Sequence, residues 1–216
     1  MHYKGNKKRV TLIVSILVVL ILALATGGVF SKYKETVNLN SVNLEVSSGK
    51  LASVFSLQEH KAVQKSDGTY ELGTEVVYSN SYRVLPGVAI PKDPYFTLNK
   101  QTKIEAYLYV EIINNLGSKG LSYSLTDDWV PLGLGVKGAN GGDGHVYSGG
   151  TNAAKKITKD FNQNPIKILK DDQITVTNAN KSSLGTVNVS FYGYLAQASL
   201  ANTAKDVFTK CFGGGN

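Results

Sequence analysis

The sequence predicts an all-β fold, a jelly-roll-like antiparallel β-sandwich over residues 32–212 with a short amphipathic helix at its C-terminal end. Three observations point to this fold. Two segments alternate regularly between apolar and polar residues, shorter apolar segments are separated by turn residues, and helical spacing of apolar residues is confined to the two ends of the chain. Eight or more short strands at this spacing are typical of a sandwich rather than of a parallel sheet.

An export leader is predicted over residues 1–31, in which a cluster of basic residues precedes an apolar run of 16 residues, Val10 to Ala25. Positive charge keeps the N-terminus inside while the run enters lipid as a helix. At about 1.5 Å per residue the run spans about 24 Å, less than the ~30 Å hydrocarbon core. We therefore expect a signal peptide that is cut between Ser31 and Lys32. The alternative is an uncleaved anchor helix that meets the membrane through residues 10–30.

The clearest strand predictions are Lys103 to Ile112 and Thr186 to Leu195, where side chains alternate with a period of two. In the first segment, one face carries Ile104, Ala106, Leu108, Val110 and Ile112, and the other carries Glu105, Tyr107, Tyr109 and Glu111. In the second, Val187, Val189, Phe191 and Leu195 alternate with Asn188, Ser190, Tyr192 and Tyr194. This pattern predicts one face in the core and one face in solvent.

Shorter strands are predicted between turn signals such as Asp67-Gly68 and Pro86-Gly87. They cover residues 42–46, 51–57, 70–78, 82–88, 95–98, 121–125, 166–169 and 173–177. Residues 133–152 contain eight glycines and few bulky side chains, so we expect a long exposed loop there.

At the C-terminal end the apolar residues change to helical spacing. They are Leu200, Ala204, Val207, Phe208, Cys211 and Phe212. Thr203 and Asp206 fit a capping box, and residues 213–216 form a glycine-rich tail that ends the helix. A short amphipathic helix is therefore expected to cover one end or edge of the sandwich.

Composition argues against an enzyme and against a nucleic-acid partner. The single Cys excludes an intramolecular disulfide and a Cys-based zinc cluster, and the three His are far apart. Residues 1–31 carry four basic residues and no acid, so they supply four of the seven net positive charges. Residues 133–138 match G-x-G-x-x-G, but more glycines follow instead of a helix. We expect no catalytic residues, cofactor or resident metal.

Three features leave alternatives open. Tyr107, Tyr109, Tyr192 and Tyr194 lie on the outer faces of the two clearest strands, as a cross-strand ladder or as a contact surface. The turn acids Asp127, Asp128, Asp143, Asp171 and Asp172 are read as solvated, with Ca²⁺ binding as the alternative. Cys211 is a small buried hydrophobe or the site of an intermolecular disulfide.

The leader and two later segments resemble a known family. The leader ends in Thr26-Gly-Gly-Val-Phe-Ser-Lys-Tyr33, similar to leaders cut by the signal peptidase SipW. Residues 85–98 (LPGVAIPKDPYFTL) run into the strand ending at Ile112, and Tyr194-Leu-Ala-Gln-Ala198 precedes the last helix. Together they resemble TasA/CalY (camelysin) proteins, the alternate signal-mediated exported proteins of Gram-positive bacteria. Leaders of this family usually continue with an aromatic residue, a small polar residue and Asp, and Tyr33-Lys34-Glu35 departs from that pattern. The sequence also has no His-Glu-x-x-His, which argues against a peptidase.

The resemblance implies an exported jelly-roll protein at the cell surface or in the biofilm matrix, processed by a SipW-like peptidase. It further implies fibres in which the N-terminal strand of one copy completes the sheet of another copy or of a related subunit. Residues 32–46 are the natural donor, with Val37, Leu39, Val42, Leu44 and Val46 as its apolar positions. The alternative is a monomeric surface domain that binds a protein or glycan through exposed Tyr residues and the glycine-rich loop.

Overall fold

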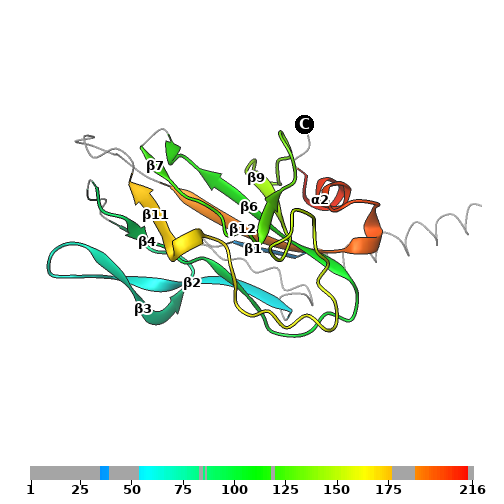
Figure 1. The fold of residues 1–216 in the computed structure, drawn as a ribbon, viewed down its shortest axis with the longest axis horizontal. Coiled ribbons are helices and arrows are strands. Elements are labelled where there is room, and N and C mark those ends of the chain that lie inside the picture. The colour runs from blue at the N-terminus through cyan, green and yellow to red at the C-terminus, as the bar shows by residue number, and fades with distance from the viewer. Residues whose placement is uncertain are drawn as a thin grey trace, which may run out of the picture.

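A computed structural model describes residues 35–38, 54–82, 85, 87–117, 120–176 and 188–213, with the backbone alone for residues 35–38. The described chain consists mainly of antiparallel strands, with one short α-helix near its C-terminal end (Figure 1). The all-β prediction is confirmed at this level. The predicted leader, residues 1–31, lies outside the described residues.

The largest sheet has five strands in the order β1-β12-β6-β9-β8, and every pair is antiparallel. Its bounds are β1 Glu35–Asn38, β12 Val189–Gln197, β6 Ala106–Asn114, β9 Asp143–Tyr147 and β8 Trp129–Pro131. The two long central strands, β6 and β12, pair in continuous register from Ala106↔Gln197 to Asn114↔Val189. They correspond to the two segments with the clearest alternation in the sequence.

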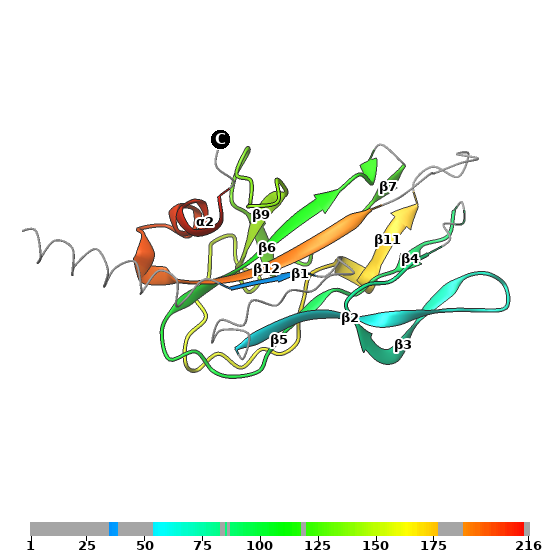
Figure 2. The same ribbon diagram turned by 180° about the vertical axis from the view of Figure 1, so that it is seen from behind.

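A second sheet of four strands has the order β10-β5-β2-β3, and a third of three strands has the order β4-β11-β7. The bounds of the second sheet are β10 Ile166–Lys167, β5 Tyr95–Leu98, β2 Phe55–Gln64 and β3 Tyr70–Val77. Those of the third are β4 Ile90–Pro91, β11 Gln173–Val176 and β7 Leu121–Ser122. Short 3₁₀ turns follow β10 and β12, at Lys170–Asp172 and Ala198–Leu200. Figure 2 shows the β2–β5 layer on one side of the β6–β12 layer and the helix α2 (Ala204–Phe212) on the other.

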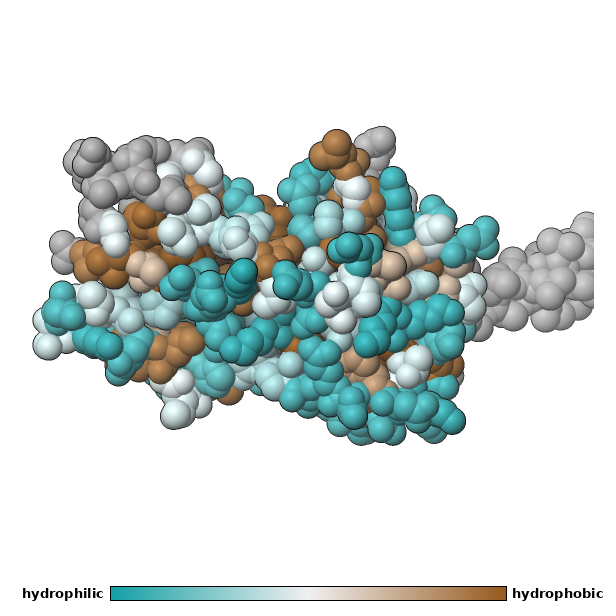
Figure 3. Space-filling model, in the orientation of Figure 1, coloured by the Kyte–Doolittle hydropathy of each residue, from teal (hydrophilic) through white to brown (hydrophobic). Residues whose placement is uncertain are grey.

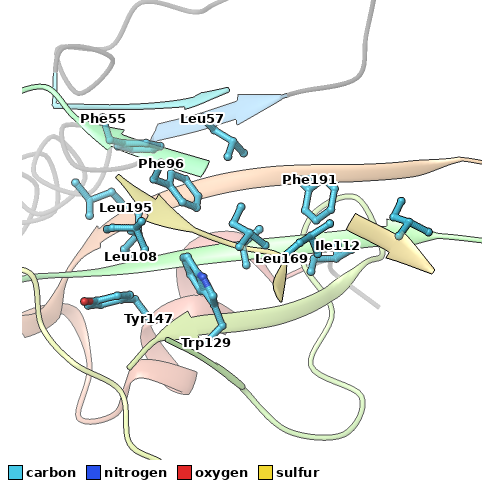
Figure 4. Close-up of a cluster of buried hydrophobic side chains, with 14 of the residues drawn as sticks. Phe55, Leu57, Phe96, Leu108, Ile112, Trp129, Tyr147, Leu169, Phe191 and Leu195 are labelled. Atoms are coloured by element: carbon cyan, nitrogen blue, oxygen red, sulfur yellow. The ribbon is translucent and has the colours of Figure 1, made fainter. Parts of the chain in front are cut away.

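The main core lies between these two layers, and Figure 4 shows its largest side chains. Phe55, Leu57 and Phe96 come from the second sheet and meet Leu108, Ile112, Phe191 and Leu195 of the first sheet. The layers approach closely at Gly193, where a Cβ would lie 2.4 Å from the Phe96 ring. A glycine is therefore required in the middle of β12.

The C-terminal helix has the bounds and the cap that the sequence predicts. Thr203 Oγ1 accepts a hydrogen bond from the Asp206 backbone N–H at 3.1 Å, and the helix ends at Gly213. Ala204, Val207, Phe208 and Phe212 are buried, as their spacing indicates. They cover the outer face of the five-stranded sheet rather than an edge of the sandwich, in a second apolar cluster.

Two element predictions need correction. Residues 133–152 are not one exposed loop, because β9 lies within them, paired on both sides in the five-stranded sheet. A Cβ at Gly144 would lie 2.8 Å from the Phe208 ring, so the glycine lets the helix pack on this strand. The described residues of 82–88 contain no strand. The predicted strand 42–46 lies outside the described residues.

Candidate functional site

The tyrosines predicted as an exposed surface lie mostly under α2. Tyr109 and Tyr194 are 0% and 1% exposed, Tyr107 is 9% exposed, and Tyr192 is half-buried. The ring centroids of Tyr109 and Phe208 are 5.2 Å apart, and those of Tyr194 and Phe212 are 4.5 Å apart. An exposed contact surface at Tyr107, Tyr109 and Tyr194 is therefore wrong, because the C-terminal helix covers the face that alternation alone assigns to solvent.

The hydroxyls of these buried tyrosines are satisfied within the cluster. Tyr109 donates to the backbone carbonyl of Ala204 at 3.0 Å, and Tyr194 donates to the Glu111 carboxylate. Burial raises the pKa of both hydroxyls above the ordinary value for tyrosine, and the neighbouring Glu111 raises that of Tyr194 further. Both remain neutral donors, which suits a structural role and not proton transfer near neutral pH.

The glycine-rich segment is fixed to the same face by Glu111, whose side chain is fully buried. Its Oε1 accepts from the backbone N–H of Gly142 at 2.7 Å and of Asn140 at 3.0 Å. Its Oε2 accepts from the Asn140 side chain at 3.1 Å and from Tyr194. Four donors thus stabilise this carboxylate, and they hold the turn before β9 in place.

The N-terminal strand β1 occupies an edge of the five-stranded sheet. It pairs antiparallel with β12 of the same chain, from Glu35↔Leu195 to Asn38↔Tyr192. Val37 of the predicted donor lies in this strand, opposite Gly193. The other predicted donor positions, Leu39, Val42, Leu44 and Val46, and the predicted cleavage residues, Ser31 and Lys32, lie outside the described residues.

The second sheet carries a polar groove that the sequence analysis missed. The outward side chains of Gln58, Tyr95 and Lys167 align across β2, β5 and β10, because their residues are register partners. With His60, Thr97 and other neighbours they line a groove of about 550 Å³, which we call the β5 groove. Figure 3 shows hydrophilic residues along the lower edge of the molecule, in the layer that contains β2 and β3 in Figure 1.

Two pairs of side chains fix the residues at one end of the β5 groove. Asp93 accepts from the backbone N–H of His60 at 3.0 Å, and its other oxygen lies 2.6 Å from the His60 Nδ1. Behind them, Lys92 Nζ lies 2.6 Å from Glu59 Oε2, with both side chains almost fully buried. Because a buried pair of this kind is costly to break, Asp93 and His60 have little freedom to move.

Three of the predicted turn acids each have a partner close to them. Asp143 pairs with Lys137 at 2.6 Å, Asp172 pairs with Lys167, and Asp128 accepts from the Gln163 side chain at 3.0 Å. Within the described ranges, no group of three His, Cys, Asp or Glu side chains is placed to hold a metal ion. Cys211 is half-buried against the aromatic cluster under α2.

Comparisons with known proteins add no assignment. No family model matches the sequence, and neither a curated protein nor a solved structure matches it. Of the helices in the described part of the chain, none has the length and apolar character needed to cross a membrane.

Proposed function

We propose that this chain is an exported, non-enzymatic structural protein of the TasA type, a fibre or biofilm-matrix subunit on the surface of a Gram-positive bacterium. In this proposal the sandwich is a jelly roll, a SipW-like peptidase removes residues 1–31, and subunits join through the N-terminal strand. The observation that carries the proposal is the position of β1, the first described strand of the chain, at an edge of the five-stranded sheet.

An edge strand at the start of the described chain is suited to exchange between copies. The pairing of β1 with β12 uses main-chain groups over four residue pairs, which the same segment of another copy can supply with the same register. Strand β12 is held on its other side by β6 over nine residue pairs, so the acceptor stays formed when β1 leaves. The apolar residues of 32–46 are the expected source of additional affinity.

Disulfide trapping tests the exchange. Asn38 and Tyr192 are register partners, so Asn38→Cys and Tyr192→Cys are introduced separately into residues 32–216 that carry Cys211→Ser. When the two variants are mixed and oxidised, we expect a disulfide-linked heterodimer. Asn38→Cys mixed with Lys61→Cys, on the exposed hairpin of the other sheet, is the control and should give none. If the first mixture gives no heterodimer and forms no filaments, the result contradicts the proposal.

A monomeric surface domain that binds a protein or glycan is the second candidate. The observation that favours it is that β1 completes the sheet of its own chain. With Asn38→Cys and Tyr192→Cys in one chain, this candidate predicts only an intramolecular disulfide. Removal of residues 32–46 would then destabilise the monomer instead of abolishing assembly.

A further inference from the structure

We propose that the open face of the second sheet binds an extended neutral polysaccharide, independently of how subunits assemble. A second hollow of about 190 Å³ lies beside the β5 groove, and Asn164 lines both. We call the second hollow the amide pocket. Its polar lining includes Asn99, Gln101, Thr102 and Asn162.

The β5 groove presents ordered hydroxyls and rings. Gln58 Nε2 donates to the Tyr95 hydroxyl at 3.1 Å and to Thr97 Oγ1 at 3.4 Å, which leaves both hydroxyls their own protons for a ligand. The rings of His60 and Tyr95 are in contact, tilted by 32° to each other with centroids 5.3 Å apart. Because an Asp93 carboxylate oxygen lies 2.6 Å from the His60 Nδ1, this ring nitrogen already has a partner and Nε2 is the one left for a ligand.

The amide pocket supplies a second set of polar groups together with apolar ones. Its lining includes the apolar side chains of Leu98, Ile157 and Phe161 and the amide side chains of Asn99, Gln101 and Asn162. Thr102 also lines this pocket; the residue is 7% exposed, and its buried hydroxyl has no hydrogen-bond partner in the described chain. An unsatisfied buried hydroxyl costs stability, so a ligand group that reached it would be bound more tightly.

The chemistry of the site favours a sugar chain over a peptide. Strand β5 is paired on both sides, by β2 and by β10, so a peptide cannot add to it as a further strand. Peptides also need apolar pockets for anchoring side chains, whereas most residues that line these two hollows carry polar groups. The two carboxylates that line the β5 groove already have partners, Asp93 in His60 and Asp172 in Lys167, which favours a ligand without net charge there.

The length of the site favours a chain over a single sugar. Strand β5 alone extends about 10 Å from Tyr95, in the β5 groove, to Leu98, at the amide pocket. Successive units of one chain would therefore lie on the two sides of Asn164.

Affinity electrophoresis of the full-length protein tests this proposal. Native gels are cast with a neutral polysaccharide (dextran, hydroxyethyl cellulose or glycol chitin), with the polyuronate alginate, or with gelatin as an unfolded polypeptide. A polyoxyethylene detergent keeps the apolar leader in solution without offering a sugar headgroup. We expect retardation by at least one neutral polysaccharide. Retardation by none of them, or only by alginate or by gelatin, overturns the proposal.

Matched variants connect the binding to the two hollows. Gln58→Ala and Asn162→Ala should each weaken binding about three- to tenfold, the effect of losing one or two hydrogen bonds. Gln64→Ala, near the hairpin end of the same strand β2, and Asn152→Ala, in an exposed loop, are the controls and should bind like the wild type. Equal retardation of all four variants and the wild type overturns the assignment of the site.

Thr102→Val separates a ligand contact from a structural role. Loss of the hydroxyl should weaken binding about three- to tenfold, while the thermal midpoint stays constant or rises because no unsatisfied polar atom remains. A purely structural hydroxyl predicts the opposite result, a lower midpoint with unchanged binding, and that outcome removes Thr102 from the site.

Discussion

The outer faces of the two main sheets differ, although both sheets share one core. On the five-stranded sheet, Tyr109 and Tyr194 point outward and are covered by Phe208 and Phe212 of α2. On the second sheet, Gln58 and Thr97 point outward and line an open groove. Alternation of period two identifies both faces in each strand, but it does not say which outer face a later segment covers.

The largest expected effect is on the covered face, where Phe208 is fully buried against the two tyrosines. Phe208→Ala should lower the free energy of unfolding by about 3–5 kcal/mol, since it leaves a cavity under the helix. On the open face, Thr97→Ala should change it by less than about 0.5 kcal/mol. Urea unfolding of both variants measures the two changes in the free energy of unfolding. Similar losses for both variants would show that the covered and the open face contribute equally to stability.

The next largest loss of stability is expected at the buried carboxylate of Glu111. Glu111→Gln replaces one acceptor oxygen by an NH₂ group that faces donors, so we expect a loss of about 1.5–3 kcal/mol. Hydrogen exchange at the Gly142 amide, which Glu111 accepts, should become faster. Glu75→Gln, at an exposed ion pair with Lys61, is the control and should cost less than about 1 kcal/mol.

A substitution at Gly193, where the two layers approach closely, should cost as much stability as Glu111→Gln or less. A methyl group there collides with the Phe96 ring, so Gly193→Ala should cost about 1–3 kcal/mol in thermal or urea unfolding. Gly117→Ala is the matched control, because no atom of the described residues, its chain neighbours aside, lies within 4 Å of a Cβ at that position. If Gly193→Ala were as mild as its control, the packing of the layers at this point would be looser than described.

The smallest effect concerns His145 on β9. Desolvation lowers its pKa below the ordinary 6.5, against smaller opposing effects of the Asp143 carbonyl and carboxylate. The unfolded chain then binds the proton more readily, so stability falls as the pH drops below about 6.5 and is fully present above it. His145→Gln should reduce the difference in unfolding free energy between pH 7.5 and pH 5.5. An unchanged difference would show that His145 is not desolvated.

The sequence predicts the elements whose signals are local. Strand β5 has the predicted bounds, and α2 follows its cap at Thr203 because the cap and the apolar stripe are adjacent in the chain. The sequence does not predict strand β9, because Gly144 interrupts the run of strand-forming residues. A glycine is needed at this position for the close contact with Phe208. That contact exists only in the folded chain.

The site could be predicted less well than the fold. The outward positions Gln58 and His60 are visible in the alternation of β2, but the groove also needs Tyr95, Thr97 and Lys167 from distant segments. Only the pairing of β10 with β5 and of β5 with β2 brings these side chains together. The buried position of Tyr109 and Tyr194 was missed for the same reason, since the residues that cover them follow later in the chain.

The location of α2 at the end of the described chain also has a consequence for biosynthesis. Ribosomes complete β6, β9 and β12 before they make residues 204–212, and these strands leave their aromatic side uncovered until then. A product truncated before Ala204 would expose Tyr107, Tyr109 and Tyr194 to water and to chaperones or proteases. The aromatic side of the sheet is therefore covered only after residues 204–212 have been made.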